Sequence, residues 1–393
     1  MQEEARLRVG IDLAPLRPPW TGVGNYQLQL LQALVARDDA PALEGLRSLR
    51  PVRIDKPFID SMADAKADAR AGTSATGRLP AWIEPAAARI YLLLRSQTFA
   101  WRARSSSWSL FHSFLYVPPG PLKVPVIPVV YDVSFVRFPE MHPARRLRAL
   151  AGLGRLLENA PVVHTISQFS AAEIAAVYGI SLRRIKVIYP GVGTMFMGAT
   201  PTNGPGLMKY DLAAGRYFLV VSTLEPRKNL RTLVAAYSRL PQTERAQVPL
   251  CVVGPSGWGL LELPMTHREL EREGSLRFLG FVADADLPML YANARAMLYP
   301  SIYEGFGLPI LEALACGCPV ICSNAASMPE AAGEAAQRIS PLDVDAWTGK
   351  FKEAMAAKSS EREKADRIAH ARRFTWERAA AQTIDLYKEA LAR

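Results

Sequence analysis

The sequence predicts an α/β protein with two mostly parallel sheets, and three observations support this class. Short β-branched runs alternate with amphipathic stretches along the chain, which is typical of repeated strand-helix units. The length of 393 residues is about that of two ordinary domains. Residues 191–215 are rich in Gly, Pro, Thr and Asn without a sustained period, as in a linker between two domains.

The order of the elements follows from these runs. In the first half, we expect strands at residues 8–13, 124–131, 162–166 and 186–189, and helices at 23–36, 144–158 and 171–178. Residues 55–85 show no clear period and are predicted to be an irregular or mobile insertion. In the second half, strands are expected at 217–221, 250–253, 277–279, 296–299 and 319–322, with helices between them. Thr375 is expected to cap a final helix over 376–391.

We place the domain boundary near residue 203. The first domain is then 1–202, the second is 203–375, and residues 376–393 form the final helix. Hydrophobic residues make up 49% and charged residues 21%, which excludes a disordered, collagenous or coiled-coil protein. No apolar run reaches the roughly 18 residues of a membrane span, and Glu3 and Glu4 make the start too acidic for a secretory signal. A cytoplasmic location is therefore expected.

The net charge of +10 belongs to the first half of the chain. Residues 1–200 carry 24 Lys and Arg against 15 Asp and Glu, and residues 85–155 carry 10 against 2. Around Trp101 the arginines alternate with apolar and aromatic residues. Such a face suits an anionic membrane, or it is a solvated helix whose arginine stems cover apolar surface, and both interpretations stay open. A nucleic-acid binder would need a basic groove with stacking aromatics or a known motif, and the sequence shows neither.

Several common sites are disfavoured by the residue pattern. Cysteines 251, 316, 318 and 322 are too few for a disulfide framework and are expected to be buried thiols. Four histidines lack metal-ligand spacing and are expected to be packing or surface residues, so no metal is implied: His112, His142, His164 and His267. The chain has no Gly-x-Ser-x-Gly elbow and no Walker A loop, which argues against the simplest hydrolases and kinases.

A glycine loop after the expected strand 296–299 has the features of an anion site. Gly305 and Gly307 allow close approach of the backbone to a ligand, and a helix opening at Pro309 would offer free amides and a favourable dipole to a phosphate. Glu312, expected in the first turn, can accept hydrogen bonds from vicinal hydroxyls such as those of a ribose. Glu304 would face the other end of that ligand. Alternatively, Glu312 only complements the helix dipole and Glu304 is a turn residue.

Two adjacent cations follow the expected strand 217–221. Arg227 can bind phosphate oxygens bidentately and Lys228 adds a compact charge, so the pair suits a diphosphate. Taken by itself, the pair of cations would be better interpreted as the tip of a basic loop. Because the glutamate loop lies at another strand end of the same half, ligand binding is the stronger interpretation.

The first half offers weaker signals. Gly22-Val23-Gly24 is a short turn into a helix that either approaches a ligand or only packs closely, and it lacks the third glycine of the dinucleotide fingerprint. Asp132, in the pair Tyr131-Asp132 at a strand end, either orients a substrate hydroxyl or caps the next segment.

Together these segments resemble the GT-B glycosyltransferases of family four, a retaining group that includes bacterial mannosyltransferases of cell-envelope polysaccharides. The most specific pieces are residues 223–230, the two glutamates of the segment 304–312, and Ser327-Met328-Pro329-Glu330-Ala331-Ala332-Gly333. Supporting pieces include residues 22–26, Ser167-Gln168-Phe169-Ser170, 188–192, 280–282 and 374–378. The resemblance covers nearly the whole chain and implies two Rossmann-like domains facing a cleft, with the last helix crossing back to the first domain.

The resemblance also implies roles for particular residues. Arg227 and Lys228 match the pair that binds the donor diphosphate and stabilises the leaving charge, Glu312 the carboxylate on the ribose, and Glu304 the carboxylate contacting the sugar. Further positions match the donor site: Gly24, Ser222, Thr223, Val282, Gly305, Phe306, Gly307 and Leu308. Many relatives have His-Asp where this chain has Tyr131-Asp132, and tyrosine is a poor general base at neutral pH, so this pair is carried over only as a possible acceptor contact.

The implied activity is metal-independent transfer of a hexose with retention, with no cofactor beyond a nucleotide sugar as co-substrate. The sequence of residues 224–229 favours mannose from GDP-mannose as the donor. Donors of rhamnose, fucose, glucose and galactose stay open as alternatives. A saccharide on a polyprenyl diphosphate at the inner face of the membrane, as in lipopolysaccharide synthesis, would suit the basic first domain. The alternatives are a GT-B sugar epimerase, which needs no acceptor, and a nonenzymatic nucleotide-sugar sensor.

Overall fold

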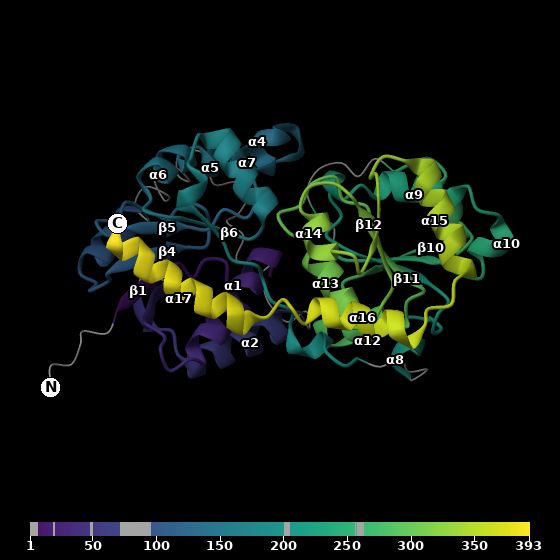
Figure 1. Cartoon of the computed structure of the whole chain (residues 1–393), viewed down its shortest axis with the longest axis horizontal. Coiled ribbons are helices and arrows are strands. Elements are labelled where there is room, and N and C mark those ends of the chain that lie inside the picture. The colour runs from purple at the N-terminus through teal and green to yellow at the C-terminus, as the bar shows by residue number, and fades with distance from the viewer. Residues whose placement is uncertain are drawn as a thin grey trace, which may run out of the picture.

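Two mostly parallel sheets organise the chain, one in each lobe of the molecule (Figure 1). The computed structural model describes residues 7–18, 20–47, 50–70, 96–199, 205–255, 257 and 263–393. The first sheet has the order β3-β2-β1-β4-β5 and the second the order β10-β9-β8-β11-β12-β13. Among the described strands, only β2 and β3 pair antiparallel. The predicted α/β class with two parallel sheets is confirmed.

The first domain begins the chain. Its strands are β1 (Arg8–Ile11), β2 (Ala42–Arg47), β3 (Arg50–Arg53), β4 (Leu110–Ser113), β5 (Val126–Pro128), β6 (Val163–Thr165) and β7 (Ile185–Val187). Its helices are α1 (Gly22–Val35), α2 (Lys56–Arg70), α4 (Ser134–Arg137), α5 (Ala144–Leu150), α6 (Leu153–Asn159) and α7 (Gln168–Tyr178), and residues 96–104 are also helical. A bridge between Val129 and His164 joins β6 and β7 to the main sheet.

The second domain has the strand order of a doubly wound sheet. Its strands are β8 (Phe218–Val221), β9 (Leu250–Val253), β10 (Leu276–Gly280), β11 (Ala296–Tyr299), β12 (Val320–Ser323) and β13 (Gln337–Ile339). Its helices are α8 (Pro205–Met208), α9 (Leu230–Ser238), α10 (Gln242–Arg245), α11 (His267–Arg272), α12 (Leu287–Asn293), α13 (Leu308–Ala315), α14 (Met328–Ala332), α15 (Val344–Ala356) and α16 (Glu361–Ala371). The order reverses between β8 and β11, and ligands of such sheets bind beyond the carboxyl ends of the strands at this point.

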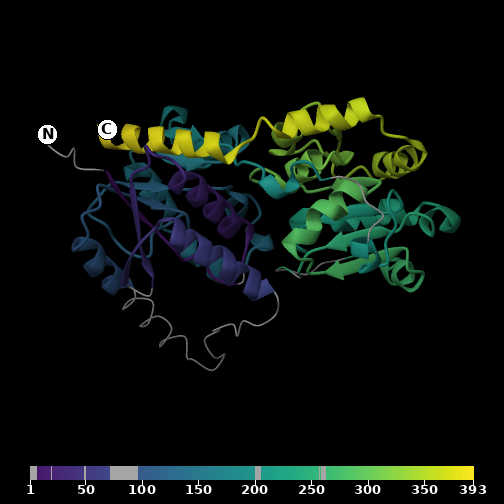
Figure 2. The same cartoon turned by 90° about the horizontal axis from the view of Figure 1, so that it is seen from below.

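The last helix returns to the first domain. α17 (Trp376–Ala392) begins after Thr375, whose hydroxyl accepts a hydrogen bond from the Arg378 amide at 3.1 Å, so the predicted cap is confirmed. It packs against α1, and the rings of Trp376 and Tyr26 lie 5.4 Å apart. Figure 2 shows α16 and α17 along one side of the molecule, one on each lobe. The crossing back of the final helix agrees with the resemblance.

A buried hydrogen-bonded chain fixes α17 to the first sheet. His112 Nδ1 lies 2.9 Å from the Tyr387 hydroxyl, His112 Nε2 lies 3.0 Å from His164 Nδ1, and His164 Nε2 lies 3.0 Å from the Tyr26 hydroxyl. Burial lowers the pKa of both imidazoles, that of His164 to about 3, so both stay neutral. These two histidines are packing residues, as predicted.

Two expectations for the helices were wrong. Residues 56–70 of the presumed irregular insertion form α2, which buries Ile59 and Met62. Its apolar stripe is narrow and lies among charged residues, which is why the period was missed; residues 71–85 lie outside the described residues. The single helix expected over 144–158 is two helices, α5 and α6, separated at Ala151 and Gly152. Glycine weakens a helix interior because it loses more backbone entropy than alanine.

Strands were also missed. The sequence analysis did not predict β2, β3, β4 or β13. The first two lie toward one edge of their sheet, and β13 is an edge strand of the other sheet. The proposed boundary near residue 203 falls on residues 200–204, which lie outside the described part of the chain, and stays a prediction. All four cysteines are buried free thiols, as expected.

Candidate functional site

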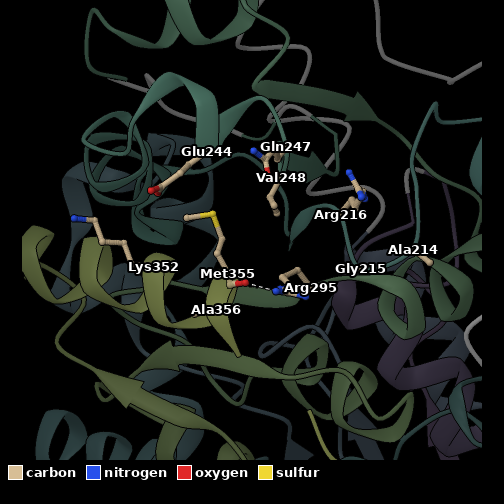
Figure 3. Close-up of a pocket in the computed structure, with 10 residues that line it drawn as sticks. All are labelled: Ala214, Gly215, Arg216, Glu244, Gln247, Val248, Arg295, Lys352, Met355 and Ala356. Carbon is tan, nitrogen blue, oxygen red and sulfur yellow. Dashed lines mark hydrogen bonds between the residues drawn. The ribbon is translucent and has the colours of Figure 1, made fainter. Parts of the chain in front are cut away.

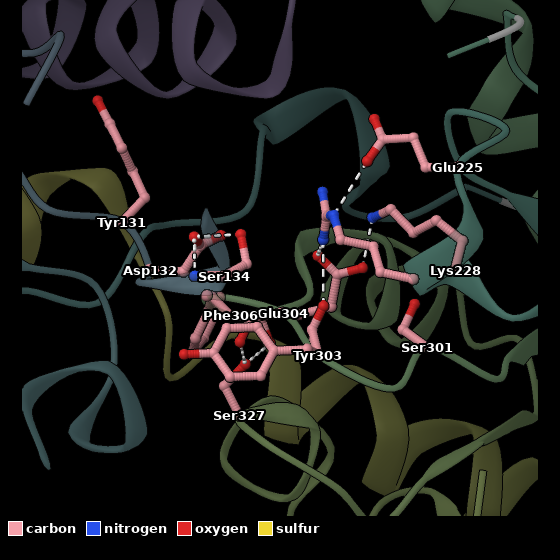
Figure 4. A network of polar contacts seen from close by, with 12 residues as sticks. Tyr131, Asp132, Ser134, Glu225, Lys228, Ser301, Tyr303, Glu304, Phe306 and Ser327 are labelled. Atoms are coloured by element: carbon pink, nitrogen blue, oxygen red, sulfur yellow. Dashed lines mark hydrogen bonds and ion pairs between the residues drawn. The ribbon is translucent and has the colours of Figure 1, made fainter. Parts of the chain in front are cut away.

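The predicted cations and the predicted glutamate meet at the carboxyl ends of β8 and β11 (Figure 4). Glu304 accepts a hydrogen bond from Arg227 Nη1 at 2.7 Å through one carboxylate oxygen, and Lys228 Nζ bonds its other oxygen. Arg227 Nε also lies 2.9 Å from a carboxylate oxygen of Glu225. The side chains of Arg227, Lys228 and Glu304 are 16%, 11% and 9% exposed. They form one buried ionic network.

The loop that carries the cations is held by Asn229. Residues 226–228 form a short 3-10 turn, and Asn229 follows it with a φ of 57°. Asparagine tolerates this left-handed conformation better than most residues. The side-chain Nδ2 of Asn229 donates to the carbonyls of Pro300 and Pro341 at 3.0 and 2.6 Å. The loop after β8 is thereby fixed to the loop after β11, which positions the cations beside Glu304.

Within the network, the neighbouring charges counteract the effect of burial on the pKa values of Glu304 and Lys228. Burial alone would raise the pKa of Glu304, but the attraction of Arg227 and Lys228 outweighs it and lowers that pKa to about 2. Burial lowers the pKa of Lys228, and the neighbouring Glu304 limits that fall. Burial raises the pKa of Glu225 despite the two cations. The network is therefore ionised at neutral pH through Glu304, and its charges are fixed where the diphosphate was predicted to bind.

The glycine loop presents amides rather than carbonyls. The Ser327 hydroxyl donates to the carbonyls of Glu304 and Phe306 at 2.8 and 3.0 Å. In the described structure, the amides of residues 305–308 donate no hydrogen bond. Gly307 precedes α13 with a φ of 108°, which disfavours any residue with a side chain. Unsatisfied amides at a helix start are suited to an anion or to hydroxyl oxygens.

Glu312 lies one residue farther into α13 than predicted, because the helix starts at Leu308 and not at Pro309. It is the fifth residue of the helix, so the sequence analysis was wrong to place it in the first turn. The Tyr291 hydroxyl donates to one of its carboxylate oxygens at 3.0 Å. Burial raises the pKa of Glu312 to about 7, against the lowering effect of that hydrogen bond. The other carboxylate oxygen remains an acceptor for hydroxyl groups.

The other predicted donor residues differ in what they offer. Val282 is 4% exposed, so its side chain belongs to the core, whereas the neighbouring Phe281 is 48% exposed. Ser222 and Thr223 lie just beyond β8 and are half-buried; the Ser222 amide extends the pairing with β9 through the Val253 carbonyl at 3.0 Å. Leu308 is the first residue of α13 and is half-buried.

Gly24 is required by packing within the first domain. A Cβ at this position would lie 2.5 Å from the Pro15 carbonyl oxygen. The Gly24 amide is 3.5 Å from the Thr21 hydroxyl that caps α1. The close-packing interpretation left open by the sequence explains this glycine, and a donor contact from Gly24 stays a prediction.

The side chains of Tyr131 and Asp132 differ in their hydrogen bonding. Asp132 accepts hydrogen bonds from the Ser134 amide and hydroxyl at 3.0 and 2.8 Å, so it caps the segment that begins α4 (Figure 4). Tyr131 is 6% exposed, and its hydroxyl has no hydrogen-bond partner among the described residues. Its ring packs edge-on against Tyr26 and Tyr116 at 5.5 and 5.6 Å. The Tyr131 hydroxyl is thus buried without a partner among the described residues, and an acceptor contact from this pair stays a prediction.

Sequence reasoning missed several residues around the site. His142 is 7% exposed and lies close enough to Asp132 and Arg227 for their charges to affect its pKa, which burial lowers. Glu225 stood inside a quoted motif but received no role. Glu173 of α7 accepts a hydrogen bond from the Tyr303 hydroxyl at 3.1 Å, and only the fold brings these residues together. No local sequence signal indicates that contact.

A separate pocket of about 580 Å³ opens at the opposite, amino-terminal edge of the second sheet (Figure 3). It is lined by Ala214, Gly215, Arg216, Glu244, Gln247, Val248, Arg295, Lys352, Met355 and Ala356. Arg295 donates to the carbonyls of Ala354 and Met355 at the end of α15, so two of its side-chain nitrogens are already hydrogen-bonded within the protein. None of the predicted site residues lies in this pocket.

The described residues contain neither a metal-binding cluster nor a membrane-spanning helix. Within these ranges, no group of three or more His, Cys, Asp or Glu side chains is arranged to hold a metal ion. No helix in the described part of the chain combines the length and the apolar character needed to cross a bilayer.

The chain is similar to known proteins in both sequence and structure. The family model "Glycosyl transferases group 1" matches residues 213–373. O-antigen chain mannosyltransferase B of Escherichia coli is 37% identical over 382 residues, which cover 95% of this chain and 97% of that protein. Sucrose-phosphate synthase of Thermosynechococcus elongatus has a similar structure, with a TM-score of 0.68 and 18% identity over 98% of this chain and all of that one. The Anabaena HepE protein in complex with UDP gives a TM-score of 0.65 and 19% identity, covering 97% of this chain and 99% of that one.

Proposed function

Because this chain belongs to the group 1 glycosyltransferases, we propose that it transfers mannose from GDP-mannose, with retention, to a saccharide acceptor in cell-envelope polysaccharide synthesis. The observation that carries the proposal is the buried Arg227–Glu304–Lys228 network beside the unpaired amides of residues 305–308 in the described structure. Mannose is favoured because the relative that is 37% identical over nearly the whole chain is a mannosyltransferase of O-antigen chains.

The network suits the departure of a nucleoside diphosphate. As the bond between the anomeric carbon and the diphosphate oxygen breaks, negative charge grows on that oxygen. Fixed charges on Arg227 and Lys228 stabilise it without reorganisation, since both are already held in place. The amides at the start of α13 act in the same way. The reaction therefore needs no metal ion for this step in our proposal.

The acceptor hydroxyl then forms the new bond on the face that the diphosphate leaves. Its proton passes to the departing phosphate, so no side chain serves as a nucleophile. Glu304 contacts the sugar in this proposal while it keeps Arg227 and Lys228 in place. Glu312 accepts hydrogen bonds from the ribose hydroxyls through the oxygen that Tyr291 does not use.

The acceptor is proposed to be a saccharide on a polyprenyl diphosphate, reached at an anionic membrane surface. The support is the basic first domain and the helix at residues 96–104, where Trp101 is 60% exposed and the Arg102 guanidinium lies 4.7 Å above its ring. An interfacial aromatic beside arginine is typical of peripheral membrane contact. Co-sedimentation with anionic vesicles that weakens as salt increases would support it, and binding that ignores lipid charge would contradict it.

The first experiment is a thermal-shift screen against GDP, UDP, dTDP and ADP and their common sugars. A ligand at 100 times its Kd stabilises the folded state by about 2.7 kcal/mol, which is easily detected. A shift with GDP and GDP-mannose alone supports the proposed donor. A shift with another nucleotide keeps the transferase but rejects mannose from GDP-mannose. Incubation with donor alone then excludes an epimerase if no altered sugar and free nucleotide appear.

A further inference from the structure

Two motifs of the sequence meet across the domain junction, and their contact has not been described so far. Ser167-Gln168-Phe169-Ser170 opens α7 in the first domain, and Ser327-Met328-Pro329-Glu330 opens α14 in the second. The Glu330 carboxylate accepts hydrogen bonds from the amides of Gln168 and Phe169 at 2.8 and 2.6 Å. The Tyr189 hydroxyl donates to the same carboxylate at 2.9 Å.

These bonds are of an unusually strong type. The first amides of a helix have no partner within it, and a carboxylate there is favoured by both hydrogen bonding and the helix dipole. α7 already has a local cap, because the Ser167 hydroxyl accepts from the Ser170 amide at 2.9 Å. The Ser167 cap does not reach the amides of Gln168 and Phe169, and Glu330 supplies charged hydrogen bonds to these two amides from the other domain.

The same turn of α7 contacts the glycine loop. The Ser170 hydroxyl lies 2.9 Å from the Tyr131 carbonyl oxygen and 3.3 Å from that of Gly305. Gly305 is packed so closely on the first domain that a Cβ there would overlap the Tyr131 carbonyl oxygen. The Phe169 and Tyr303 rings lie edge-on with centroids 5.2 Å apart. The helix held by Glu330 thus sets the distance between the end of β5 and the glycine loop.

We propose that Glu330 is a positioning residue for glycosyl transfer, which holds α7 of the first domain against the glycine loop of the second domain. The inference rests on the proposed function. Arg227, Lys228, Glu312 and the amides of residues 305–308 all lie in the second domain, so nucleotide binding does not need this contact. The approach of an acceptor bound to the first domain does need it, because small displacements of reacting groups lower rates strongly.

The test compares Glu330→Gln with Glu334→Gln in the full chain. The substitution at position 330 would place a side-chain amide, itself a donor, against the amide donors of α7. By contrast, the side chain of Glu334 is 93% exposed, and among the described residues its ion pair is with Arg338 of β13. We expect Glu330→Gln to lower kcat for transfer about 10- to 100-fold. Its Kd for the nucleoside diphosphate identified among GDP, UDP, dTDP and ADP should stay within about twofold of wild type. Glu334→Gln should match wild type in both measurements.

Two outcomes of this kinetic comparison overturn the inference. One is transfer by Glu330→Gln at the wild-type rate, and the other is a loss of nucleotide affinity as large as the loss of kcat, which would mean that Glu330 only supports the second domain. If Glu330→Gln does not fold, Tyr189→Phe removes one of the three hydrogen bonds and should lower kcat by a smaller factor, again without weakening nucleotide binding.

A measurement without substrate separates this inference from the proposed function. Small-angle scattering should give a larger radius of gyration for Glu330→Gln than for wild type and for Glu334→Gln, because the domain junction opens. If wild type transfers no sugar from any donor, the proposed function fails while this comparison still tests the contact. An unchanged radius together with unchanged hydrogen exchange at the first turn of α7 would contradict the contact itself.

Discussion

Removal of the Glu304 charge by Glu304→Gln is the sharpest test of the ionic network. The substitution keeps the shape of the side chain but leaves Arg227 and Lys228 with one fewer carboxylate. All three side chains are at most 16% exposed, so water screens the remaining cations poorly. The variant should therefore lose stability in the second domain and also lose the contact proposed for the sugar.

The magnitude follows from two independent estimates. Breaking a buried ion pair by removing one partner costs about 3–5 kcal/mol. The fall in the pKa of Glu304 from 4.5 to about 2 corresponds to roughly 3 kcal/mol, at about 1.4 kcal/mol for each tenfold change in the acid constant. For a domain of this size, about 3 kcal/mol lowers Tm by about 6–12 °C.

The sign of the pH dependence can be checked in the same experiment. Because the pKa of Glu304 is lower in the folded than in the unfolded protein, its contribution is present above about pH 4.5 and is lost as the pH falls toward 2. The difference in Tm between wild type and Glu304→Gln should therefore be full at neutral pH and should shrink below about pH 4.5.

The assay is thermal denaturation with and without inorganic pyrophosphate, a probe that does not depend on the nucleotide base. Pyrophosphate should raise the Tm of Glu304→Gln more than that of wild type, because the probe replaces the missing anion. Asp345→Asn is the control, since its pair with Arg239 is on the surface and its side chain is 91% exposed. A Tm within about 2 °C of wild type, with the same response to pyrophosphate, would refute the reasoning.

Four other outcomes are expected. Lys228→Ala should lower kcat about 100- to 1,000-fold, and turnover at the wild-type rate would remove its role in stabilising the leaving group. Gly305→Ala should greatly reduce transfer because its Cβ would overlap the Tyr131 carbonyl oxygen, whereas Gly349→Ala, in an open part of α15, should not. Nucleotide affinity should rise roughly tenfold from about pH 6 to about pH 8 as Glu312, with a pKa of about 7, ionises, and Glu312→Gln should abolish that rise in calorimetry. Tyr131→Phe should leave Tm within about 1 °C of wild type, because the Tyr131 hydroxyl has no partner among the described residues. The same variant should raise the KM for the acceptor about fivefold to tenfold, and an unchanged KM would argue against the acceptor contact.

The local sequence was sufficient to locate the site residues that directly follow a predicted strand. Arg227 and Lys228 could be found because they directly follow a buried run that predicts a strand, and strand ends of one sheet gather at one edge. The glycine loop could be found for the same reason. The helix at 56–70 could not, since charged residues interrupt its narrow apolar stripe and its burial depends on the elements packed against it.

Contacts between distant segments required the fold. Glu304 was predicted to face a ligand, yet nothing in its own segment shows that it neutralises two cations 76 and 77 residues away. The sequence left two roles open for Asp132, and its hydrogen bonds with Ser134 show that it caps the next segment. Glu312 was placed one residue too early in its helix, because α13 starts directly after the positive φ of Gly307 and not at Pro309.

The sequence by itself determined the α/β class, the two series of strands and the cation and glutamate motifs, because periodicity, turn residues and strand-end positions are local properties of the chain. Only the tertiary structure decided which of these groups are paired, which of the described amides stay unpaired, and that Glu330 bonds the first turn of α7. The physical reason is that pairing and burial depend on distances between residues far apart in sequence. Packing of the two domains fixes those distances, and no local pattern encodes them.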